Sequence, residues 1–362
     1  MKLSTLEKNY KNKKIFVTGS TGFKGSWLCF WLHKMGAKVT GIGLKPEKGS
    51  IIFKTLKIDQ IIKQYYFDIT DYNKTNNLII KFKPDLILHL AAQSVVSESY
   101  SSPLDTINTN IIGTANILES TRVNKIKNLI IITSDKCYLN KEKNVGYRET
   151  DELGGYDNYS SSKAAAENIF NSYYSSFFFG KNVKHATVRA GNVIGGGDFK
   201  KDRIIPDIIR AIIAKKSIEI RNPQSTRPWQ HVLEPISGYL RLGELLMKNK
   251  IKKNTLPSWN FGPNKYNKAT VLKVTQNILK IWKKSKIKIK IKKNKTFKET
   301  YLLSLNIVKS KKELGWTPKL NFAEIIKYTV DWYEAYLKKE DMISFTNSQI
   351  EKYVNKNEKF KH

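Results

Sequence analysis

The stretch Thr18-Gly19-Ser20-Thr21-Gly22-Phe23-Lys24-Gly25 decides the fold of this chain of 362 residues. It follows residues 13–18, a short apolar run with β-branched and aromatic side chains that predicts a strand. It precedes residues 27–32, an apolar run that predicts a buried helix face. A glycine-rich turn between a strand and a helix is typical of a dinucleotide-binding unit.

Each of the three glycines has its own expected role in such a unit. Gly19 would allow the tight turn, Gly22 the approach of the backbone to a pyrophosphate, and Gly25 the close packing of the helix. The start of the helix adds unpaired N–H groups and a favourable dipole for phosphate. The spacing is one residue looser than in the dehydrogenase fingerprint, and glycines that merely turn the chain are the alternative interpretation.

Strand and helix signals alternate along the chain up to about residue 194. Continuous apolar runs at 85–90, 129–134 and 186–189 predict parallel strands covered on both faces. We therefore expect an α/β fold with a Rossmann-type, doubly wound parallel sheet that binds ligands at the carboxyl ends of its strands. The small residues after the first of these runs, Ala91, Ala92 and Gln93, would let a cofactor lie across the strand tip.

The expected domains follow from where this alternation ends. Residues 1–194 would form the dinucleotide-binding domain, and a segment near 228–260 would return to it. Residues 195–345 would form mainly a smaller, mixed α/β substrate-binding domain, reached through a flexible crossing at Gly195-Gly196-Gly197-Asp198. Residues 346–362 would form a terminal helix and tail, because Thr346-Asn347-Ser348-Gln349 resembles a capping box.

The run Asp157-Asn158-Tyr159-Ser160-Ser161-Ser162-Lys163 has a pattern suited to redox chemistry. Residues four apart share one face of a helix, so the Lys163 ammonium would lie near the Tyr159 phenol. A neighbouring cation favours phenolate and lowers a phenol pKa that starts near ~10. Such a phenol is a usable general base near neutral pH. The pattern alone is weak, since many surface helices contain it, but it gains weight from the glycine turn upstream.

A second segment that can carry chemistry, Ser134-Asp135-Lys136, ends the apolar run at 129–134. Nicotinamide redox chemistry needs only the Ser134 hydroxyl beside Tyr159. Asp135 and Lys136 add an acid and a base next to the reacting carbon, as an elimination requires. The alternative interpretation is an Asp–Lys pair that merely caps the strand end.

The charge of the chain raises the question of nucleic-acid binding. Lys and Arg total 64 against 31 Asp and Glu, which gives a formal net charge of +33. The excess is mostly lysine spread along the whole chain, so we expect no specific nucleic-acid partner. The densest run, residues 283–293, alternates Ile and Lys, which predicts a strand with one buried and one solvated face.

Other residue types limit location and metal binding. Cys29 and Cys137 form neither a metal-ligand pattern nor a disulfide framework, and the five histidines are scattered, so no metal is expected. The sequence has no apolar signal region and no run approaching ~18 apolar residues. We therefore expect a reduced, cytoplasmic protein with no membrane partner.

The ribose contact of the cofactor departs from the usual pattern. An acidic residue is expected roughly 20 residues past the last glycine, and the sequence has Lys45 there. We expect NAD as the cofactor. Because Lys45 would tolerate a 2′-phosphate, NADP stays open as an alternative.

Five segments together resemble the CDP-glucose 4,6-dehydratases, a family of extended short-chain dehydrogenases/reductases that act on nucleotide sugars. They are GFKGSWL at 22–28, SDK at 134–136, GGYDNYSSSKAAAE at 154–167, RAGNVIGGGD at 189–198 and RNPQSTRPWQHVLEP at 221–235. The resemblance runs from about residue 14 to about residue 351. It departs at Lys45, where this family usually carries an acid, and at Ser20, where a histidine is common.

The resemblance implies a reaction and the residues that carry it. Tyr159, supported by Lys163 and Ser134, would take the proton of the glucose 4-hydroxyl while hydride leaves C4 for the nicotinamide. Lys136 would act as the base at C5. Asp135 would be the acid that helps the C6 hydroxyl leave as water, before the hydride returns to C6.

The same resemblance, together with residue chemistry, gives the expected binding residues. Cofactor contacts are expected from Gly19, Thr21, Gly22, Phe23, Lys24, Gly25, Asp68, Ile69, Leu90, Ala91, Ala92, Gln93, Tyr159 and Lys163. Substrate contacts are expected from Arg189, Asn192, Arg203, Arg221, Arg227 and His231, since guanidinium groups match diphosphates. Asp68 would contact the adenine amine, with a helix N-cap as its alternative role. The substrate would be CDP-glucose, and a homodimer would form through helices near 110–120 and 159–178.

Two other functions stay open at this point. The first is a nucleotide-sugar epimerase or a dehydratase for another nucleoside diphosphate sugar. Ser134-Asp135-Lys136 disfavours the epimerase, because epimerisation at C4 requires no base at C5. The second is a dinucleotide-binding regulatory or nucleic-acid module, which would keep the glycine turn without needing Tyr159, Lys163 or the Asp–Lys pair.

Overall fold

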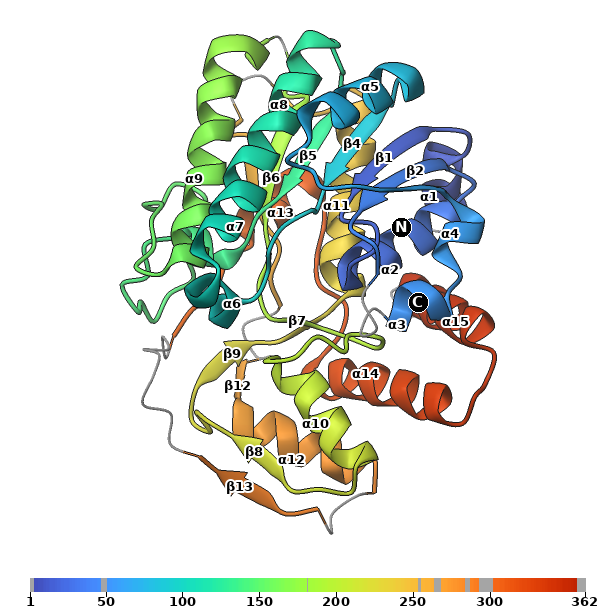
Figure 1. Cartoon of the computed structure of the whole chain (residues 1–362), viewed down its shortest axis with the longest axis vertical. Helices are drawn as coiled ribbons and strands as arrows, with labels where there is room; N and C mark the ends of the chain where they lie inside the picture. The colour runs from blue at the N-terminus through green and yellow to red at the C-terminus, as the bar shows by residue number, and fades with distance from the viewer. Residues whose placement is uncertain are drawn as a thin grey trace.

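The computed structural model describes residues 3–46, 51–180, 182–252, 255–263, 268–283, 287–292 and 302–356. Figure 1 shows two parts. The larger part is a sheet with helices on both faces, and the smaller part consists of short strands and helices below the carboxyl ends of the sheet.

The larger part confirms the expected Rossmann-type sheet. Its seven strands are all parallel and have the order β11-β6-β5-β4-β1-β2-β3. Their bounds are β1 Lys14–Thr18, β2 Lys38–Gly43, β3 Lys63–Tyr66, β4 Leu86–His89, β5 Leu129–Ile132, β6 His185–Arg189 and β11 Ser258–Asn260. The chain runs outward in one direction from β1 and in the other from β4, so a ligand crevice is expected at the carboxyl ends of these two strands.

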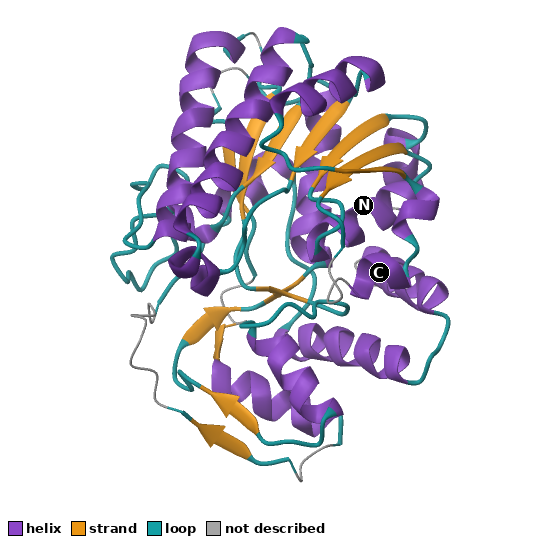
Figure 2. Ribbon diagram, in the orientation of Figure 1, coloured by secondary structure: helices purple, strands orange, loops and turns teal. Residues whose placement is uncertain are grey.

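The alternation of side chains along each strand divides the core into two layers. Ile15 and Val17 pack on one face of β1 with the helices α2 (Phe23–Lys34) and α11 (Leu233–Met247). Phe16 packs on the other face, with α5 (Tyr72–Phe82), α8 (Gly113–Val123) and α9 (Asn158–Tyr173). Both faces of the sheet are covered, as Figure 2 shows, which is why the central strands β4 and β5 are almost wholly apolar.

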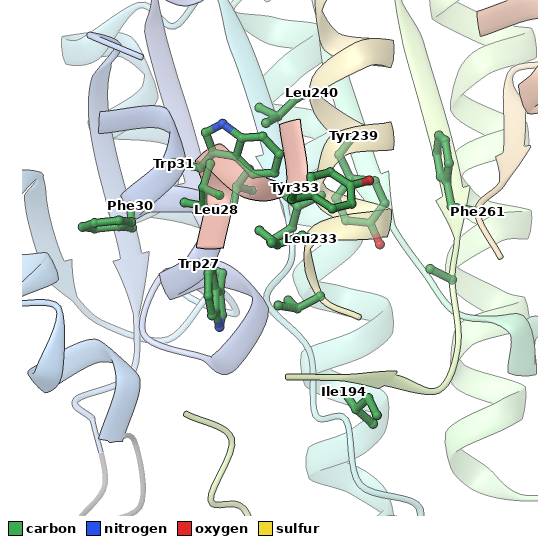
Figure 3. Packing of buried hydrophobic residues seen from close by; sticks show 14 of the residues in the cluster. Trp27, Leu28, Phe30, Trp31, Ile194, Leu233, Tyr239, Leu240, Phe261 and Tyr353 are labelled. Atoms are coloured by element: carbon green, nitrogen blue, oxygen red, sulfur yellow. The ribbon is translucent and has the colours of Figure 1, made fainter. Parts of the chain in front are cut away.

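The first layer contains most of the large aromatic residues. Figure 3 shows Trp27 and Trp31 of α2 near Leu233 and Tyr239 of α11 and Tyr353 of the terminal helix α15 (Met342–Asn355). The Trp31 and Tyr353 rings meet edge to face at 6.1 Å. Buried aromatic side chains contribute strongly to the stability of a core, because each one removes a large apolar surface from water.

Shorter elements precede or connect the sheet strands. They are α1 Leu3–Tyr10, α3 Ile51–Thr55, α4 Ile58–Ile61, α6 Val96–Ser101, α7 Pro103–Ile107, the π-helix η1 Asn108–Ile112, the 3₁₀-helix η2 Asp135–Cys137 and the π-helix η3 Tyr174–Phe178.

The smaller part is mixed α/β, as expected. Its helices are α10 (Ile204–Ile213), α12 (Val271–Ile281) and α14 (Phe322–Leu337). Three two-stranded sheets join β7 (Val193–Ile194) to β10 (Gln230–His231), β9 (Thr226–Pro228) to β12 (Lys268–Thr270), and β8 (Ile218–Ile220) to β13 (Ile289–Ile291). β13 confirms a strand within the Ile/Lys run. The predicted buried face is wrong for this strand, since Ile289 is only half-buried and Ile291 is 63% exposed. Residues 284–286 and 293 of that run lie outside the described residues.

Later segments of the chain return to the sheet. α11 packs on its first layer, and β11 forms its edge beside β6. The helix α13 (Val308–Leu314), which lies within the predicted second domain, also packs here: Ser310 Oγ donates to the Asn260 carbonyl oxygen at 2.5 Å.

Two local expectations are wrong. The crossing at 195–198 is closely packed, because a Cβ on Gly196 would lie 2.0 Å from the Trp332 ring. A Cβ on Gly197, which has a φ of +85°, would lie 2.6 Å from the Ile52 side chain. The terminal helix α15 begins at Met342 with Asp341 as its N-cap, so residue 346 lies inside it and does not start it. Residues 357–362 lie outside the described residues.

Candidate active site

The glycine turn lies between β1 and α2, and its three glycines are not equivalent. Gly19 has a φ of +70°, and a Cβ there would lie 2.7 Å from the Ala91 nitrogen. A Cβ on Gly25 would lie 2.0 Å from the Gly19 oxygen, so both positions require glycine. At Gly22, the exposed N-cap residue of α2, a Cβ would meet only the Gly19 oxygen, at 3.3 Å. Gly22 therefore presents open backbone at a helix start, where phosphate groups bind.

The ends of β1 and β4 frame this turn. Thr18 Oγ1 accepts hydrogen bonds from the backbone N–H groups of Leu90 and Ala91, at 3.1 and 3.0 Å. The half-buried Ala92 and Gln93 follow. The structure therefore brings the predicted cofactor segment 90–93 beside Gly19, at the point where the strand order reverses.

Asp68 and Ile69 follow β3 at the same end of the sheet. Asp68 Oδ1 accepts from the Thr70 N–H and from the Thr70 hydroxyl, both at 2.8 Å. The N-cap alternative for Asp68 is wrong, since Asp71 caps α5. Ile69 is buried, and its side chain lies where a Cβ on Gly113 would be.

The end of β2 lies against the glycine turn. A Cβ on Gly43 would lie 2.5 Å from Thr21 Oγ1. Lys45 follows and is exposed. Among the described residues just after β2, which are Leu44, Lys45 and Pro46, none is acidic, and residues 47–50 lie outside the described part of the chain.

The three residues predicted for redox chemistry converge. Tyr159 and Lys163 lie one turn apart on α9, which begins at its N-cap Asp157. The Lys163 Nζ is 6.0 Å from the centroid of the Tyr159 ring. Ser134, just after β5, lies close enough to the Tyr159 phenol to lower its pKa. All three side chains are more than nine-tenths buried.

Asp135 and Lys136 adjoin this group on η2. The buried Asp135 carboxylate accepts from Ser134 Oγ at 3.1 Å and from Asn192 Nδ2 at 3.3 Å, and Lys136 is half-buried. Position 191 must be glycine, which the sequence analysis missed. A Cβ there would lie 1.8 Å from Asp135 Oδ2. Its position beside Asn192 in the run RAGNV was the available signal.

Further charges face the same point. Burial raises the pKa of Asp135, whereas the positive charges of Lys136, Arg227 and Lys24 lower it. Burial and then the neighbouring Arg203 bring the pKa of Lys24 down to about 8, although Asp135 opposes this change. Charged residues from α2, η2, β9 and the segment before α10 therefore influence one another's pKa values in this site.

The expected lowering of the Tyr159 pKa does not appear in the structure. Burial raises the pKa of Tyr159 to about 12, with the Ser134 hydrogen bond opposing the rise. Burial, and then Lys24, lower the pKa of Lys163 to about 7. Desolvation disfavours the charged form of both groups, so the ammonium has too little charge at neutral pH to offset the burial of the phenol.

The substrate arginines take different positions. Arg203 donates to Asp198 Oδ2 at 2.9 Å and to Ser94 Oγ at 2.7 Å, and it acts electrostatically on Tyr159. Ser94 and Asp198 are site neighbours that the sequence analysis did not single out. Arg227, on β9, faces Asp135, as described above. The exposed Arg221 pairs with the exposed Asp202 at 3.3 Å.

Two predicted substrate residues do not face open space, so their predicted roles are wrong. Arg189 is 2% exposed and is held in an ion pair with Glu167, whose Oε2 lies 2.8 Å from Arg189 Nη2. His231 is fully buried between the rings of Trp27 and Tyr328, and burial lowers its pKa to about 3. Because Arg189 lies in β6 and His231 in β10, both side chains are enclosed by other protein groups.

No described helix is long and apolar enough to cross a membrane. No group of three or more His, Cys, Asp and Glu side chains is arranged to hold a metal ion among the described residues.

The fold and this cluster define a class of Rossmann-type enzymes that act on nucleotide sugars. The family described as GDP-mannose 4,6 dehydratase matches residues 16–329, and the chain belongs to this family. One relative, the CDP-glucose 4,6-dehydratase of Salmonella typhimurium, is 40% identical over 96% of this chain and 98% of its own length.

More distant proteins share the architecture. The dTDP-glucose 4,6-dehydratase of Bacillus anthracis in complex with NAD has a TM-score of 0.75 and 22% identity, covering 91% of this chain and 99% of the other. The UDP-glucose 4-epimerase of Thermotoga maritima with UDP-glucose has a TM-score of 0.77 and 21% identity, covering 90% and 99%. At these identities the likeness confirms the fold.

Proposed function

We propose that this protein is a CDP-glucose 4,6-dehydratase that forms CDP-4-keto-6-deoxyglucose. The observation that carries this proposal is the placement of Asp135 and Lys136 beside Tyr159, Ser134 and Lys163 in one buried cluster. An oxidoreductase or C4 epimerase needs only the last three. The 40% identical relative from Salmonella typhimurium, which carries this name, supports the same activity.

We infer that the first step is proton transfer from the sugar 4-hydroxyl to Tyr159. The Ser134 hydroxyl would hold the sugar oxygen and the phenol in line, since it lies beside that phenol. Bound NAD would supply the hydride acceptor at C4, the positive charge that favours phenolate, and the hydride returned to C6. Lys163, one helical turn from Tyr159, would add the charge of its protonated fraction, which is partial near neutral pH because its pKa is about 7.

The elimination would use Asp135 and Lys136. Oxidation at C4 makes the C5 proton acidic, and Lys136 would remove it. Asp135 would donate a proton to the C6 hydroxyl, which leaves as water. Burial raises the pKa of the Asp135 carboxyl, and this favours the protonated form that a general acid needs.

The cofactor contacts proposed above fit a dinucleotide. Gly22 offers exposed backbone at the start of α2, and the tight approach of Gly19 to Ala91 keeps the turn close to the tip of β4. We propose NAD as the cofactor, and the solved dehydratase from Bacillus anthracis in complex with NAD supports this choice. Nucleotide released from purified protein tests it: NADP as the main species would contradict NAD and would favour the Lys45 alternative.

We propose that Arg203, Arg221, Arg227 and Asn192 bind the substrate. Arg203 and Arg227 are within electrostatic reach of the catalytic groups, so they could hold a diphosphate near the reacting sugar. The specificity for cytidine is supported by the named relative alone.

Assembly and location belong to the same proposal. Leu104 of α7, Ile112 of η1, Val123 of α8 and Phe177 of η3 are between 42% and 70% exposed. Exposed apolar side chains on adjacent helices are typical of a protein interface, so we propose a homodimer through this face. Cys29 and Cys137 are both free, which supports a reducing, cytoplasmic location.

The decisive experiment incubates the purified protein and NAD with CDP-glucose, UDP-glucose, dTDP-glucose or GDP-mannose. The alkali-induced absorbance of a 4-keto sugar reports dehydration, and sugar analysis reports epimerisation. We expect the 4-keto product to form fastest from CDP-glucose. A 4-epimer without a 4-keto product would favour the epimerase, and a faster reaction with another nucleotide would overturn the cytidine assignment.

A further inference from the structure

A buried ion pair lies directly behind the active site. Glu167 is on α9, one turn beyond Lys163 and two beyond Tyr159, and it is fully buried. Arg189, at the end of β6, is 2% exposed. Arg189 donates from Nε to Glu167 Oε1 at 2.9 Å and from Nη2 to Oε2 at 2.8 Å, which is a bidentate pair.

The Glu167 carboxylate also holds a hydroxyl from each of two strand segments. Thr133 Oγ1 donates to Oε1 at 2.5 Å, and Thr187 Oγ1 donates to Oε2 at 2.8 Å. With the two guanidinium bonds, each carboxylate oxygen accepts two hydrogen bonds, which satisfies a buried carboxylate. Thr133 is the residue immediately before Ser134, so this contact reaches one end of the 134–136 segment.

The Arg189 guanidinium reaches the other end of that segment. Its Nη1 donates to Tyr138 Oη at 2.7 Å and to the Glu149 carbonyl oxygen at 3.1 Å. The guanidinium carbon lies 4.8 Å from the centroid of the Tyr138 ring. The Tyr138 hydroxyl donates onward to Asn260 on β11 at 2.8 Å. Tyr138 directly follows η2, the helix that carries Asp135 and Lys136.

We propose that Glu167 and Arg189 are positioning residues, a buried brace that sets the distance between the redox pair on α9 and the acid–base pair on η2. Both side chains of the brace are buried and paired with each other. It fixes the 134–136 segment at both ends, through Thr133 and Tyr138, to the helix that carries Tyr159 and Lys163. The link to catalysis rests on the proposed function, whereas the link between the two segments does not.

The energetics support positioning as the role of this pair. Burying two charges carries a large desolvation cost, and well-packed apolar residues of similar volume are often as stabilising. Hydrogen bonds to a planar guanidinium fix direction as well as distance, which apolar packing does less well. A dehydratase in which two pairs act in succession on adjacent carbons needs that accuracy.

Thr133 and Thr187 provide a matched pair of variants. Removing Glu167 would leave Arg189 as an unpaired buried charge and could prevent folding. Thr133→Val and Thr187→Val each remove one hydroxyl donor from the same carboxylate, and both threonines are buried. Only Thr133 adjoins the 134–136 segment, while Thr187 lies within β6.

Two measurements are made on both variants of the full-length protein. Backbone hydrogen exchange at residues 134–138 reports the position of the segment without any need for activity. Steady-state kinetics with CDP-glucose report kcat separately from KM. We expect Thr133→Val to speed exchange in this segment and to lower kcat roughly tenfold or more with little change in KM, since small displacements of catalytic groups have effects of this size. Thr187→Val should leave exchange at 134–138 unchanged and kcat within about threefold.

Equal effects of the two substitutions, or a larger effect of Thr187→Val on exchange or kcat, would overturn the brace. An inactive wild-type protein would instead overturn the proposed function. In that case the exchange comparison alone decides whether the brace exists.

Discussion

Tyr159 and Lys163 illustrate how one residue's surroundings can reverse an expectation based on its neighbour. The spacing of four residues does place the amine near the phenol. The same packing removes water from both groups, and desolvation raises the pKa of Tyr159 to about 12 and lowers that of Lys163 to about 7. Sequence spacing reports proximity, but it does not report the depth of burial that decides the charge.

Lys163 should therefore destabilise the folded protein at low pH. The unfolded lysine keeps its proton up to a pKa near ~10.4, whereas the folded lysine loses it near 7. Below about pH 7 both states are protonated and the full burial penalty applies; between the two pKa values the unfolded state binds more protons, so stability rises with pH. We expect Lys163→Met to raise the free energy of unfolding by about 2–4 kcal/mol at about pH 6.

The gain from Lys163→Met should shrink toward zero as the pH rises from about 7 to about 10. Urea unfolding at a series of pH values measures it. Lys81→Met, at an exposed lysine in the last turn of α5, is the control and should show no such trend. A gain that stays constant with pH would mean that Lys163 is not buried as an amine.

Lys136 gives a second prediction at this scale. Lys136→Ala should keep NAD bound and still allow oxidation at C4, because Tyr159, Ser134 and Lys163 are unchanged. Water elimination should fall by roughly 10²–10⁴-fold, the usual contribution of a general base. Reduced nicotinamide should then accumulate on addition of CDP-glucose, as absorbance would show. Full dehydratase activity in this variant would refute the role of Lys136, and Lys81→Ala serves as the control substitution.

At the scale of elements, different glycines of the strand–turn–helix unit serve stability and cofactor binding. A Cβ on Gly25 would lie 2.0 Å from the Gly19 oxygen, while one on Gly22 would lie 3.3 Å from the same oxygen, a tight contact that a small shift relieves. Gly25→Ala should therefore lower the free energy of unfolding by about 2–4 kcal/mol, as overpacking against backbone does. Gly22→Ala should change it by less than about 1 kcal/mol.

Gly22→Ala should instead weaken NAD binding, because its methyl group would stand where the pyrophosphate approaches the backbone. Urea unfolding and nucleotide titration of the two variants, compared with the wild type, measure both effects. Unchanged NAD affinity in Gly22→Ala would place the pyrophosphate elsewhere.

The elements that the sequence predicted well are those with continuous apolar runs. The runs at 85–90, 129–134 and 186–189 correspond to β4, β5 and β6, since strands covered on both faces are rich in apolar residues. The start of α15 was placed too late, because Thr346 looks like a cap and is instead buried, where it accepts a hydrogen bond from Trp332. A local pattern cannot report a partner that is distant in sequence.

The same limit applies to the site. Residues in compact motifs, such as Ser134-Asp135-Lys136 and Tyr159 with Lys163, converge as predicted. Arg189 was mistaken for a ligand of the diphosphate because its buried partner, Glu167, lies 22 residues away along the chain. Charge alone does not tell an arginine in an internal ion pair from one that faces a ligand.

At the scale of the whole molecule, the exposed apolar face of α7, η1, α8 and η3 predicts the assembly. Leu104 is 70% exposed, more than the other three apolar residues named on this face. Leu104→Glu should shift the protein from dimer to monomer, since a charge in an apolar interface is costly to bury. Sedimentation measures the change. Ile291→Glu, which is 63% exposed on β13 in the smaller part, is the matched control and should leave the dimer intact. A monomeric wild type, or a dimer unaffected by Leu104→Glu, would contradict this interface.

The edge strand β11 has a consequence for biosynthesis. It pairs with β6 in the sheet, yet the ribosome must add every residue from 190 to 257 after β6 before β11 exists. Until then the nascent chain carries an open strand edge next to Thr187 and Val188, and unpaired edges recruit other chains. Rapid overexpression should therefore favour inclusion bodies, and slower synthesis at low temperature, with chaperones present, should improve the yield of native protein.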